Sequence, residues 1–309
     1  MAEGGKGRIV IAGGSGFLGH ALVKEFQSHA YEVVVLTRSR KQPGKVQTVV
    51  WDGETVGEWA GFLNGAVAVI NLAGEAITKR WNDENRKKIL DSRIKSTEAI
   101  GKAIRACSAP PKVWVNVSGV GYYGDSGDAE LDEGSSAGEG FMAEICLDSE
   151  RTQVQAETPD TRKVQLRVGA VLGQGGGAFA ELAKFTKLFM GGSHGNGRQW
   201  ISWIHIDDVV AIFRWAVESN HSGPVNGVGP NPVRNSELMA TMRKAYGRPW
   251  SPPVPGFMMQ AVGAVIGKQT DILMQSQRAT SKVLRDSDFA FKWPELGQAL
   301  KDLHDQEPK

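Results

Sequence analysis

The sequence predicts an α/β protein with a doubly wound parallel sheet and a smaller, mainly helical C-terminal domain. Through the first half of the chain, short apolar runs rich in β-branched residues alternate with helix-like segments, which is the pattern of βαβ units in a parallel sheet. After Gly173 the chain changes to a glycine-rich loop, helical segments and more frequent proline. These two observations divide the chain into two expected parts.

The first strand is expected at RIVIAG (residues 8–13), because its continuous hydrophobicity fits a strand covered on both faces. Further strands are expected at residues 32–37, 46–51, 66–74, 112–119 and 163–173. Helices are expected between them at residues 16–30, 81–107 and around 141–150. The first helix carries an apolar face of Phe17, Leu18, Ala21, Leu22 and Phe26.

A short strand near residues 201–204 and a helix from about Asp207 follow the glycine-rich loop. Because this helix resembles a late helix of the first domain, we expect the two domains to be interleaved. The large domain would comprise residues 1–169 plus about 206–223, and the small domain residues 170–205 plus 224–309.

The bulk properties exclude several classes of protein. A net charge of +2, from 36 basic and 34 acidic residues, gives no reason to expect a nucleic-acid or membrane partner. The start of the chain has no apolar segment like that of a signal peptide, and the apolar run at residues 255–267 is too short to span a bilayer. Cys107 and Cys146 form no disulfide framework. We therefore expect a cytoplasmic location.

No metal site is expected, because the six histidines are scattered and neither cysteine has a partner at ligand spacing.

The strongest motif is IVIAGGSGFLGHAL (residues 9–22), which lies between a predicted strand and an amphipathic helix. Gly13 would allow the tight turn, Gly16 the close approach of the backbone to a pyrophosphate, and Gly19 close helix–strand packing. The helix N-terminus would offer free N–H groups and its positive dipole end to phosphates. The alternative is an ordinary glycine-rich turn that binds no nucleotide. The motif favours a Rossmann-type dinucleotide-binding domain.

The end of the second strand indicates which dinucleotide is bound. NAD sites usually place an acidic residue here for the ribose 2′-hydroxyl, whereas NADP sites place an arginine near the 2′-phosphate. This chain has Arg38 and no acidic residue until Asp52. A guanidinium can pair with a phosphate in bidentate fashion, so the sequence favours NADP(H). Asp52 is either a hydrogen-bond acceptor for the adenine amino group or a turn residue in WDGE.

With NLAGE (71–75), VSGVGYYG (117–124), LRVGAVLG (166–173) and WIHIDD (203–208), the chain resembles the extended, epimerase-type short-chain dehydrogenase/reductase family. More narrowly it resembles the atypical branch of sugar-nucleotide-epimerase-like, or "cell-division inhibitor"-like, proteins. The resemblance runs through essentially the whole chain. It implies a Rossmann domain, a small substrate domain and NADP(H) as the cofactor.

The resemblance assigns expected roles to individual residues. The phosphate loop would be Gly13, Ser15, Gly16, Phe17 and Leu18, and Arg38 would meet the 2′-phosphate. The cofactor would also be bordered by Leu72, Ala73 and Gly74 at the adenosine ribose, by Val117 near the nicotinamide, and by Arg167 and Val168 below its amide. Ser118 would be the family's substrate-orienting hydroxyl; alternatively, it satisfies a nearby backbone group.

One part of the family pattern is missing. The catalytic helix of the family carries a tyrosine and, four residues later, a lysine, which together handle the proton and hold the nicotinamide ribose. Alignment on Glu150 places Met142 and Cys146 at these positions, and a shift of one residue places Phe141 and Ile145 there. Loss of a positioned general acid or base typically costs about 10²–10⁴ in rate. The standard mechanism is therefore not expected.

Other residues are candidates for the substrate side of the cleft. Tyr123 is a candidate substrate contact and a weak candidate acid, or a tyrosine packed at the domain junction with its hydroxyl in water. Glu75 either faces the crevice or is a helix-start carboxylate. Arg93 meets an anionic substrate or forms a salt bridge with Glu75 or Asp91. Trp203, on one strand face with His205, is a candidate substrate wall, although His205 is more readily explained as a core histidine.

Two functions are compatible with this sequence. One is an NADP-dependent oxidoreductase or epimerase acting on a small polar substrate, with Ser118 as orienting group and Tyr123, Glu75 or water as the source of protons. The other is a catalytically inactive NADP(H)-binding regulatory protein. The intact phosphate loop and the missing Tyr-Lys pair separate the two.

Overall fold

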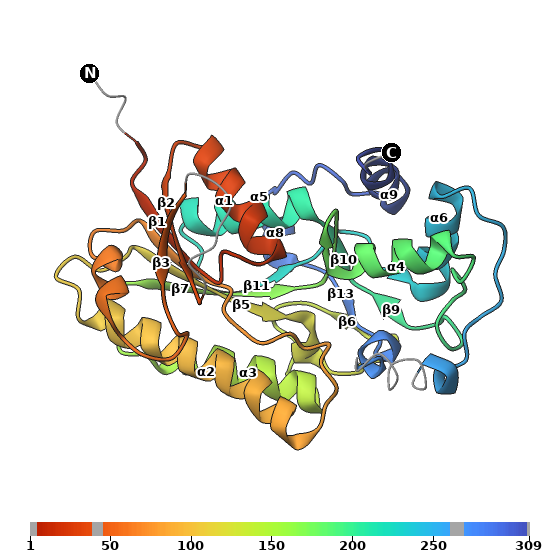
Figure 1. Cartoon of the computed structure of the whole chain (residues 1–309), viewed down its shortest axis with the longest axis horizontal. Coiled ribbons are helices and arrows are strands. Elements are labelled where there is room, and N and C mark those ends of the chain that lie inside the picture. Colours follow the sequence, from red (N-terminus) through yellow and green to blue (C-terminus); the bar gives the residue numbers. More distant parts are fainter. Residues whose placement is uncertain (1–4, 39–45, 260–268, 308–309) are drawn as a thin grey trace.

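The computed structural model describes residues 5–38, 46–259 and 269–307 of the 309-residue chain. A seven-stranded sheet runs through its centre in the order β11-β7-β5-β4-β1-β2-β3, with every neighbouring pair parallel (Figure 1). The strands are β1 (Arg8–Ala12), β2 (Glu32–Thr37), β3 (Gln47–Val50), β4 (Ala68–Asn71), β5 (Val113–Gly119), β7 (Arg162–Val168) and β11 (Gly223–Gly227). The order reverses between β1 and β4, where open α/β sheets bind their ligands.

Helices cover both faces of the sheet, which explains why its strands are apolar on both sides. Helices α1 (Phe17–Ser28) and α5 (Ile206–Glu218) lie on one face, and α2 (Asp83–Arg105) and α3 (Phe141–Gln155) lie on the other (Figure 1). The 3-10 helix η1 (Glu58–Leu63) joins the α2 side. The doubly wound, Rossmann-type α/β fold predicted from the sequence is confirmed.

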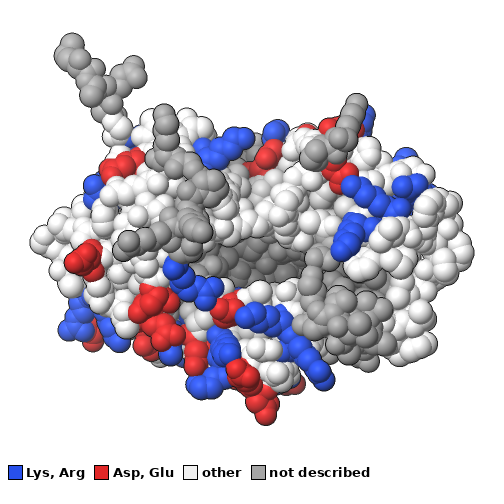
Figure 2. All heavy atoms as spheres, viewed as in Figure 1, with Lys and Arg blue, Asp and Glu red and all other residues white. Residues whose placement is uncertain are grey.

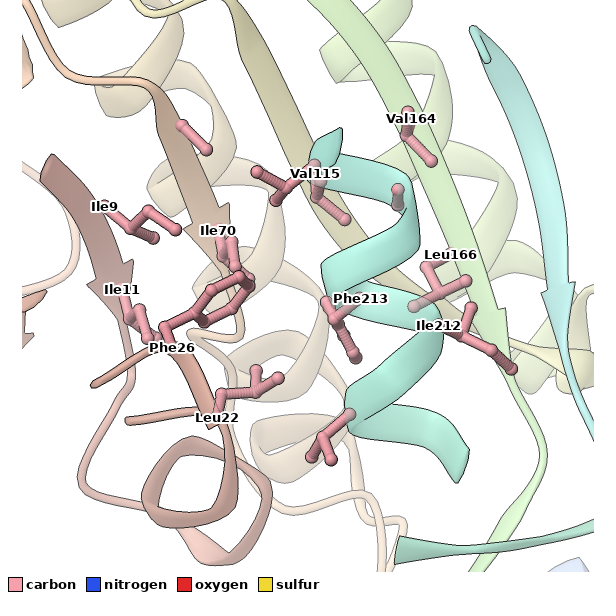
Figure 3. Close-up of a cluster of buried hydrophobic side chains, with 14 of the residues drawn as sticks. Ile9, Ile11, Leu22, Phe26, Ile70, Val115, Val164, Leu166, Ile212 and Phe213 are labelled. Carbon is pink, nitrogen blue, oxygen red and sulfur yellow. The ribbon is translucent and has the colours of Figure 1, made fainter. Parts of the chain in front are cut away.

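The core beneath α1 and α5 is made of aliphatic and aromatic side chains from six strands of the central sheet and both helices. Figure 3 shows Phe26 and Leu22 of α1 packed toward Ile9, Ile11 and Ile70, with Ile212 and Phe213 of α5 over Val115, Val164 and Leu166. All of these side chains are buried. Their burial holds the carboxyl ends of the strands in register above the core.

The remaining chain builds a smaller unit beside the sheet, seen on the right of Figure 1. Its apolar core includes Phe179, Trp203, Met242 and Leu300. Its helices are α4 (Gly177–Lys187), α6 (Asn235–Ala245) and α9 (Leu296–Asp305). Short strands pair in three two-stranded sheets: β8 (Ala170–Gly173) with β10 (Trp203–His205), β9 (Trp200–Ile201) with β12 (Val233–Arg234), and β6 (Glu130–Leu131) with β13 (Arg278–Ala279).

Two details differ from the sequence prediction. The single strand expected at residues 163–173 is broken at Gly169, because β8 leaves the large sheet and pairs with β10 instead. A side chain at Gly169 would collide with Ser202, since a Cβ there would lie 2.2 Å from the Ser202 carbonyl oxygen. This break turns the chain from one unit into the other.

The domain boundary expected at about residue 223 falls within β11, which pairs with β7 along its whole length. In addition, α8 (Lys282–Asp286) returns to the large sheet, and its Leu284 is buried in the core of Figure 3. The two units are therefore interleaved more than once.

No helix in the described part of the chain is long and apolar enough to cross a membrane. Residues 260–268, which include most of the apolar run at residues 255–267, lie outside the described residues.

Candidate functional site

The turn between β1 and α1 has the geometry expected of a phosphate-binding loop. Gly13 adopts φ +75°, and a Cβ there would lie 2.9 Å from the Leu72 backbone. A Cβ at Gly19 would lie 2.5 Å from Gly14, so the helix passes directly against the turn. A Cβ at Gly16 would meet only the Gly13 carbonyl, at 3.6 Å, and no side chain caps the helix there. The N-terminus of α1 thus opens toward the carboxyl end of the sheet.

Phe17, the first residue of α1, connects the phosphate-binding loop to the small unit. The glycine-rich segment 173–177 wraps its ring, since a Cβ at Gly176 would come within 2.6 Å of the ring carbons. Ser15 is exposed and its hydroxyl accepts a hydrogen bond from Thr37 at 3.0 Å. The Phe17 side chain is therefore held by this segment, while the backbone N–H groups of Phe17 and Leu18 lie in the first turn of α1.

Arg38 forms part of a charged cluster across the strand ends. Its guanidinium donates to the Glu75 carboxylate at 2.9 Å, and Lys79 donates to the other oxygen at 2.7 Å. The hydrogen bonds from Lys79 and Arg38 hold the pKa of Glu75 below its usual range. Since β1 lies between β2 and β4, the Arg38–Glu75 pair spans the carboxyl end of β1. Glu75 is therefore not a free carboxylate at the crevice.

Asp52 is a turn residue, the second of the two roles considered for it. Its carboxylate accepts the backbone N–H groups of Glu54 and Thr55, both at 2.8 Å, and the Thr55 hydroxyl at 2.5 Å. These bonds, the Thr55 hydroxyl first, lower the pKa of Asp52.

A buried chain of amides positions the segment after β4. Asn71 and Asn116 are neighbours on β4 and β5, and Asn71 Nδ2 donates to Asn116 Oδ1 at 2.8 Å. Asn116 in turn donates to Ser149 of α3 at 3.2 Å, while Asn71 Oδ1 accepts the Ala73 N–H at 3.0 Å. Ala73 is thus held in place beside Leu72 and Gly74. The sequence signal for this hydrogen-bonded network was a pair of asparagines in two apolar strands, and the sequence prediction did not use that signal.

Ser118, at the end of β5, belongs to a second buried network. Its hydroxyl donates to Glu150 Oε1 at 2.7 Å. Arg167 binds the same carboxylate through two nitrogens, at 3.0 and 2.8 Å, and the two side chains are only 4% and 9% exposed. Burial by itself lowers the pKa of Arg167, but the bonds to Glu150 raise it. The Arg167 side chain is therefore committed to Glu150, and only its backbone, with that of half-buried Val117 and Val168, can border a cofactor.

The structure places Tyr123 away from the cleft. Its side chain is 2% exposed, and its hydroxyl lies 2.7 Å from Asn226 Oδ1 and 3.1 Å from an Arg167 nitrogen. Burial raises the pKa of Tyr123 to about 12, against the lowering effect of Arg167. This burial does not fit the proposed role of Tyr123 as an acid or substrate contact. The tyrosine is packed, as the alternative expected, but its hydroxyl is buried and hydrogen-bonded and not in water.

Met142 and Cys146 lie where α3 packs against the end of β5 and the loop that follows it. Met142 packs against Gly121, and a Cβ there would lie 3.0 Å from its methyl carbon. The Cys146 thiol lies against Gly119 and contacts the Ser118 hydroxyl, and burial raises its pKa. Both residues therefore lie close to the carboxyl end of β5, which carries Ser118.

Arg93, on α2, turns toward the same strand ends. Its guanidinium packs against Gly74, where a Cβ would lie 3.0 Å from the Arg93 Cζ. Nη1 donates to the carbonyl oxygens of Glu75 at 3.1 Å and Ile89 at 2.9 Å. The salt bridges considered for Arg93 do not form, because the Glu75 carboxylate binds Arg38 and Lys79 and Asp91 binds Lys87.

Trp203 is not part of a substrate wall. It is fully buried in the small-unit core, and its indole N–H donates to the Asn231 carbonyl at 2.8 Å. Its strand neighbour His205 is also buried, and His205 Nδ1 accepts the Asp207 N–H at 3.1 Å, which caps α5. The core-histidine alternative for His205 agrees with these contacts.

The described parts of the chain contain no group of three or more metal-ligating side chains.

Figure 2 shows one face of the molecule, which is hollowed across its middle, with basic and acidic side chains on the rim toward α2. Several candidate groups come together at the carboxyl ends of β1, β2, β4 and β5. They are the phosphate loop, the Arg38–Glu75–Lys79 cluster, Ser118, Cys146 and Arg93.

An open phosphate loop at the switch point of a seven-stranded parallel sheet defines a dinucleotide-binding-type α/β protein. A family model described as "NAD dependent epimerase/dehydratase family" matches residues 9–228, and a second, described as "Domain of unknown function (DUF1731)", matches residues 254–303. The chain belongs to the NAD dependent epimerase/dehydratase family, and the predicted epimerase-type resemblance is confirmed.

Among its relatives, the human epimerase family protein SDR39U1 is 36% identical over 304 residues, which cover 96% of this chain and 99% of the human protein. The chloroplastic SDR39U1 homolog of Arabidopsis thaliana is 34% identical over 95% of this chain and 85% of its own length. A crystal structure of human SDR39U1 (isoform 2) with NADPH superposes with a TM-score of 0.87 at 35% identity, covering 97% of this chain and all of that one.

Proposed function

We propose that this protein binds NADP(H) and transfers hydride between the nicotinamide and a small polar substrate, as an oxidoreductase or epimerase. The observation that carries the proposal is the open, uncapped N-terminus of α1 behind Gly13 and Gly16. Free N–H groups and the helix dipole at such an end bind phosphates. The crystal structure of human SDR39U1 with NADPH supports the same cofactor.

Arg38 is the residue proposed to select the 2′-phosphate. Its side chain is 75% exposed, so it can turn toward a ligand. When Arg38 leaves Glu75, Lys79 still neutralises that carboxylate, so the exchange does not strand an unpaired charge. The proposed preference for NADPH therefore rests on a cation that the fold leaves free to move.

Ser118 is proposed to orient the substrate. Because its hydrogen is donated to Glu150, its lone pairs are left to accept a hydrogen bond from a substrate hydroxyl. Arg167 donates to both oxygens of the same carboxylate and so holds Glu150 in place beside Ser118. With Tyr123 sealed in the junction and Glu75 paired with two cations, we assign proton exchange to water in the cleft.

The bound cofactor would supply the hydride donor or acceptor, and the chain would supply position and exclusion of water. The alternative, a catalytically inactive NADP(H)-binding regulatory protein, is favoured by the apolar Met142 and buried Cys146 in place of the Tyr-Lys pair. In both cases we expect a small molecule rather than nucleic acid or a membrane as the partner, and a cytoplasmic location.

Fluorescence titration with NADPH and NADH tests the cofactor assignment. We expect NADPH to bind more tightly, and Arg38→Ala to weaken NADPH by about 10- to 100-fold, since charge-assisted hydrogen bonds to the 2′-phosphate are lost. NADH binding should not change, and Arg285→Ala, an exposed change elsewhere, should affect neither ligand. Equal affinity of the unaltered protein for both cofactors would refute the 2′-phosphate assignment.

Turnover is tested by following the absorbance of reduced nicotinamide with a panel of small polar alcohols and carbonyl compounds. Consumption or formation of NADPH with any of them supports the enzyme. Tight NADPH binding without change across the panel, and without solvent hydrogen exchange into the substrates, favours the regulatory alternative.

A further inference from the structure

The Arg93 guanidinium is a half-buried cation with one edge unused. Both hydrogens of Nη1 are donated to backbone carbonyl oxygens, whereas Nε and Nη2 have no hydrogen-bond partner among the described residues. No described carboxylate lies within ion-pair distance of it, and the Glu75 and Asp91 carboxylates are each paired with other cations. A charge removed from water without a partner is costly, so a ligand that pairs with it is favoured.

The guanidinium lies beside the carboxyl end of β4, where the phosphate loop and Ser118 also lie. Among described side chains, the fully buried nitrogens that lack a partner include Trp114 Nε1 but no nitrogen of Arg93, so Nε and Nη2 are not completely sealed from solvent. The guanidinium packs on Gly74 at the end of β4, and it lies near enough to the Cys146 thiol for each to influence the ionisation of the other. Cys146 in turn contacts Ser118.

The backbone fixes this edge in direction. The two carbonyl oxygens of Glu75 and Ile89 hold Nη1 from behind, and Gly74 leaves room for the flat group because it has no side chain. A planar Nε–Nη2 edge matches the two oxygens of a carboxylate or phosphate. The cofactor phosphates are already provided for at α1, on the opposite face of the sheet from α2.

We propose that Arg93 binds an anionic group of the substrate, a carboxylate or a phosphate, and so orients the substrate between Ser118 and the nicotinamide. This inference rests on the proposed function, because it requires a cofactor in the cleft. Arg93 would thereby supply a positive charge beside the position where the family has its lysine, from α2 instead of α3.

The test measures anion binding by the NADPH-saturated protein, with inorganic phosphate and malonate as separate probes. Binding is followed by the rise in melting temperature and by isothermal titration. We expect at least one probe to bind the unaltered protein, and R93Q to weaken it by about 10- to 100-fold. R93K should bind malonate less tightly than the unaltered protein, because an ammonium is a point charge. R105Q, the same change at an exposed position of α2, is the control.

The NADPH affinity of the same variants separates the possible failures. Unchanged NADPH affinity in R93Q supports a substrate role, whereas a loss of tenfold or more would show that the edge serves the cofactor and would overturn the proposal. Anion binding that survives in R93Q, or is absent from the unaltered NADPH complex with both probes, also overturns it. If NADPH does not bind the unaltered protein, the proposed function fails first. If R93Q does not fold, R93K serves in its place, because the lysine ammonium can still donate to the backbone carbonyl oxygens of Glu75 and Ile89.

Discussion

At the scale of single residues, the polar side chains near the strand ends are organised by partners from distant parts of the chain. The Glu150 carboxylate on α3 accepts hydrogen bonds from Ser118 of β5 and Arg167 of β7. Ser118 and Arg167 are neighbours in the sheet. Removing one member of a buried pair leaves the other charge uncompensated, so such a network has few tolerable substitutions. Its role is to hold Ser118 in one hydrogen-bonding state.

His205 illustrates a residue whose burial predicts a pH effect. Burial lowers its pKa, although Asp207 and Asp302 oppose the shift and Lys292 adds to it. Above about pH 6.5 the imidazole is neutral in both folded and unfolded chains. As the pH falls, the unfolded chain takes up the proton first, so the free energy of unfolding decreases by at most about 1.4 kcal/mol per pH unit from this group.

We therefore expect the free energy of unfolding to fall more steeply between pH 7 and pH 5 in the unaltered protein than in His205→Asn. Asparagine retains an acceptor for the Asp207 N–H at the start of α5, and it does not titrate. Urea denaturation at several pH values measures the difference. His20→Asn, at an exposed position, should keep the steep dependence. Parallel pH profiles for His205→Asn and the unaltered protein would contradict the assignment.

At the residue scale, the sequence predicted positions better than side-chain roles. Motif positions such as Gly13 and Arg38 lie at the strand ends where they were expected, because strand and loop follow from local pattern. The roles predicted for Tyr123 and Trp203 do not fit their burial, because burial depends on what packs over a side chain. Tyr123 bonds to Asn226, 103 residues away, and no local pattern contains that contact.

At the scale of elements, two glycines of the motif at the β1–α1 turn have different functions. A side chain at Gly19 would strike the backbone of Gly14, and one at Gly16 would enter nearly open space. Gly19 is needed for packing, and Gly16 keeps the approach to the helix N-terminus clear.

A pair of alanine substitutions tests this division. Gly19→Ala should lower the free energy of unfolding by about 1–3 kcal/mol or more, because the turn and helix must separate. Gly16→Ala should change stability by less than about 1 kcal/mol, because its φ of −83° suits alanine. It should nevertheless weaken NADPH by at least about tenfold. Chemical denaturation and NADPH titration check both, with Gly61→Ala, where a Cβ meets nothing within 4 Å, as a helical-glycine control.

If Gly16→Ala binds NADPH as tightly as the unaltered protein, the phosphates do not approach this end of α1. If Gly19→Ala is as stable as Gly61→Ala, the close helix–turn contact is not maintained in solution.

At the scale of the whole molecule, the last part of the chain completes the large unit. Leu284, in α8, is fully buried in the core formed by the central sheet, α1 and α5. The break at Gly169 and the return at α8 join the two units through several crossings. The molecule is therefore expected to unfold as a single cooperative unit rather than domain by domain.

Leu284→Ala should accordingly lower the free energy of unfolding by about 2–5 kcal/mol, the range for a large cavity in a packed core. Arg285→Ala, the exposed neighbour in the same helix, should have little effect. Denaturation followed by both circular dichroism and tryptophan fluorescence should show one shared transition. Separate transitions, or a loss well below 1 kcal/mol, would show that the C-terminal segment is not integral to the large unit.

The sequence by itself determined the doubly wound sheet, the phosphate loop and the absence of a Tyr-Lys pair from α3. Each depends on residues close together in the chain, where hydrophobic period and backbone geometry act directly. Only the tertiary structure decided that Arg38 pairs with Glu75, that Ser118 donates to Glu150, and that Arg93 presents a free edge beside Cys146. These contacts join different elements, and their geometry exists only once the helices have packed on the sheet.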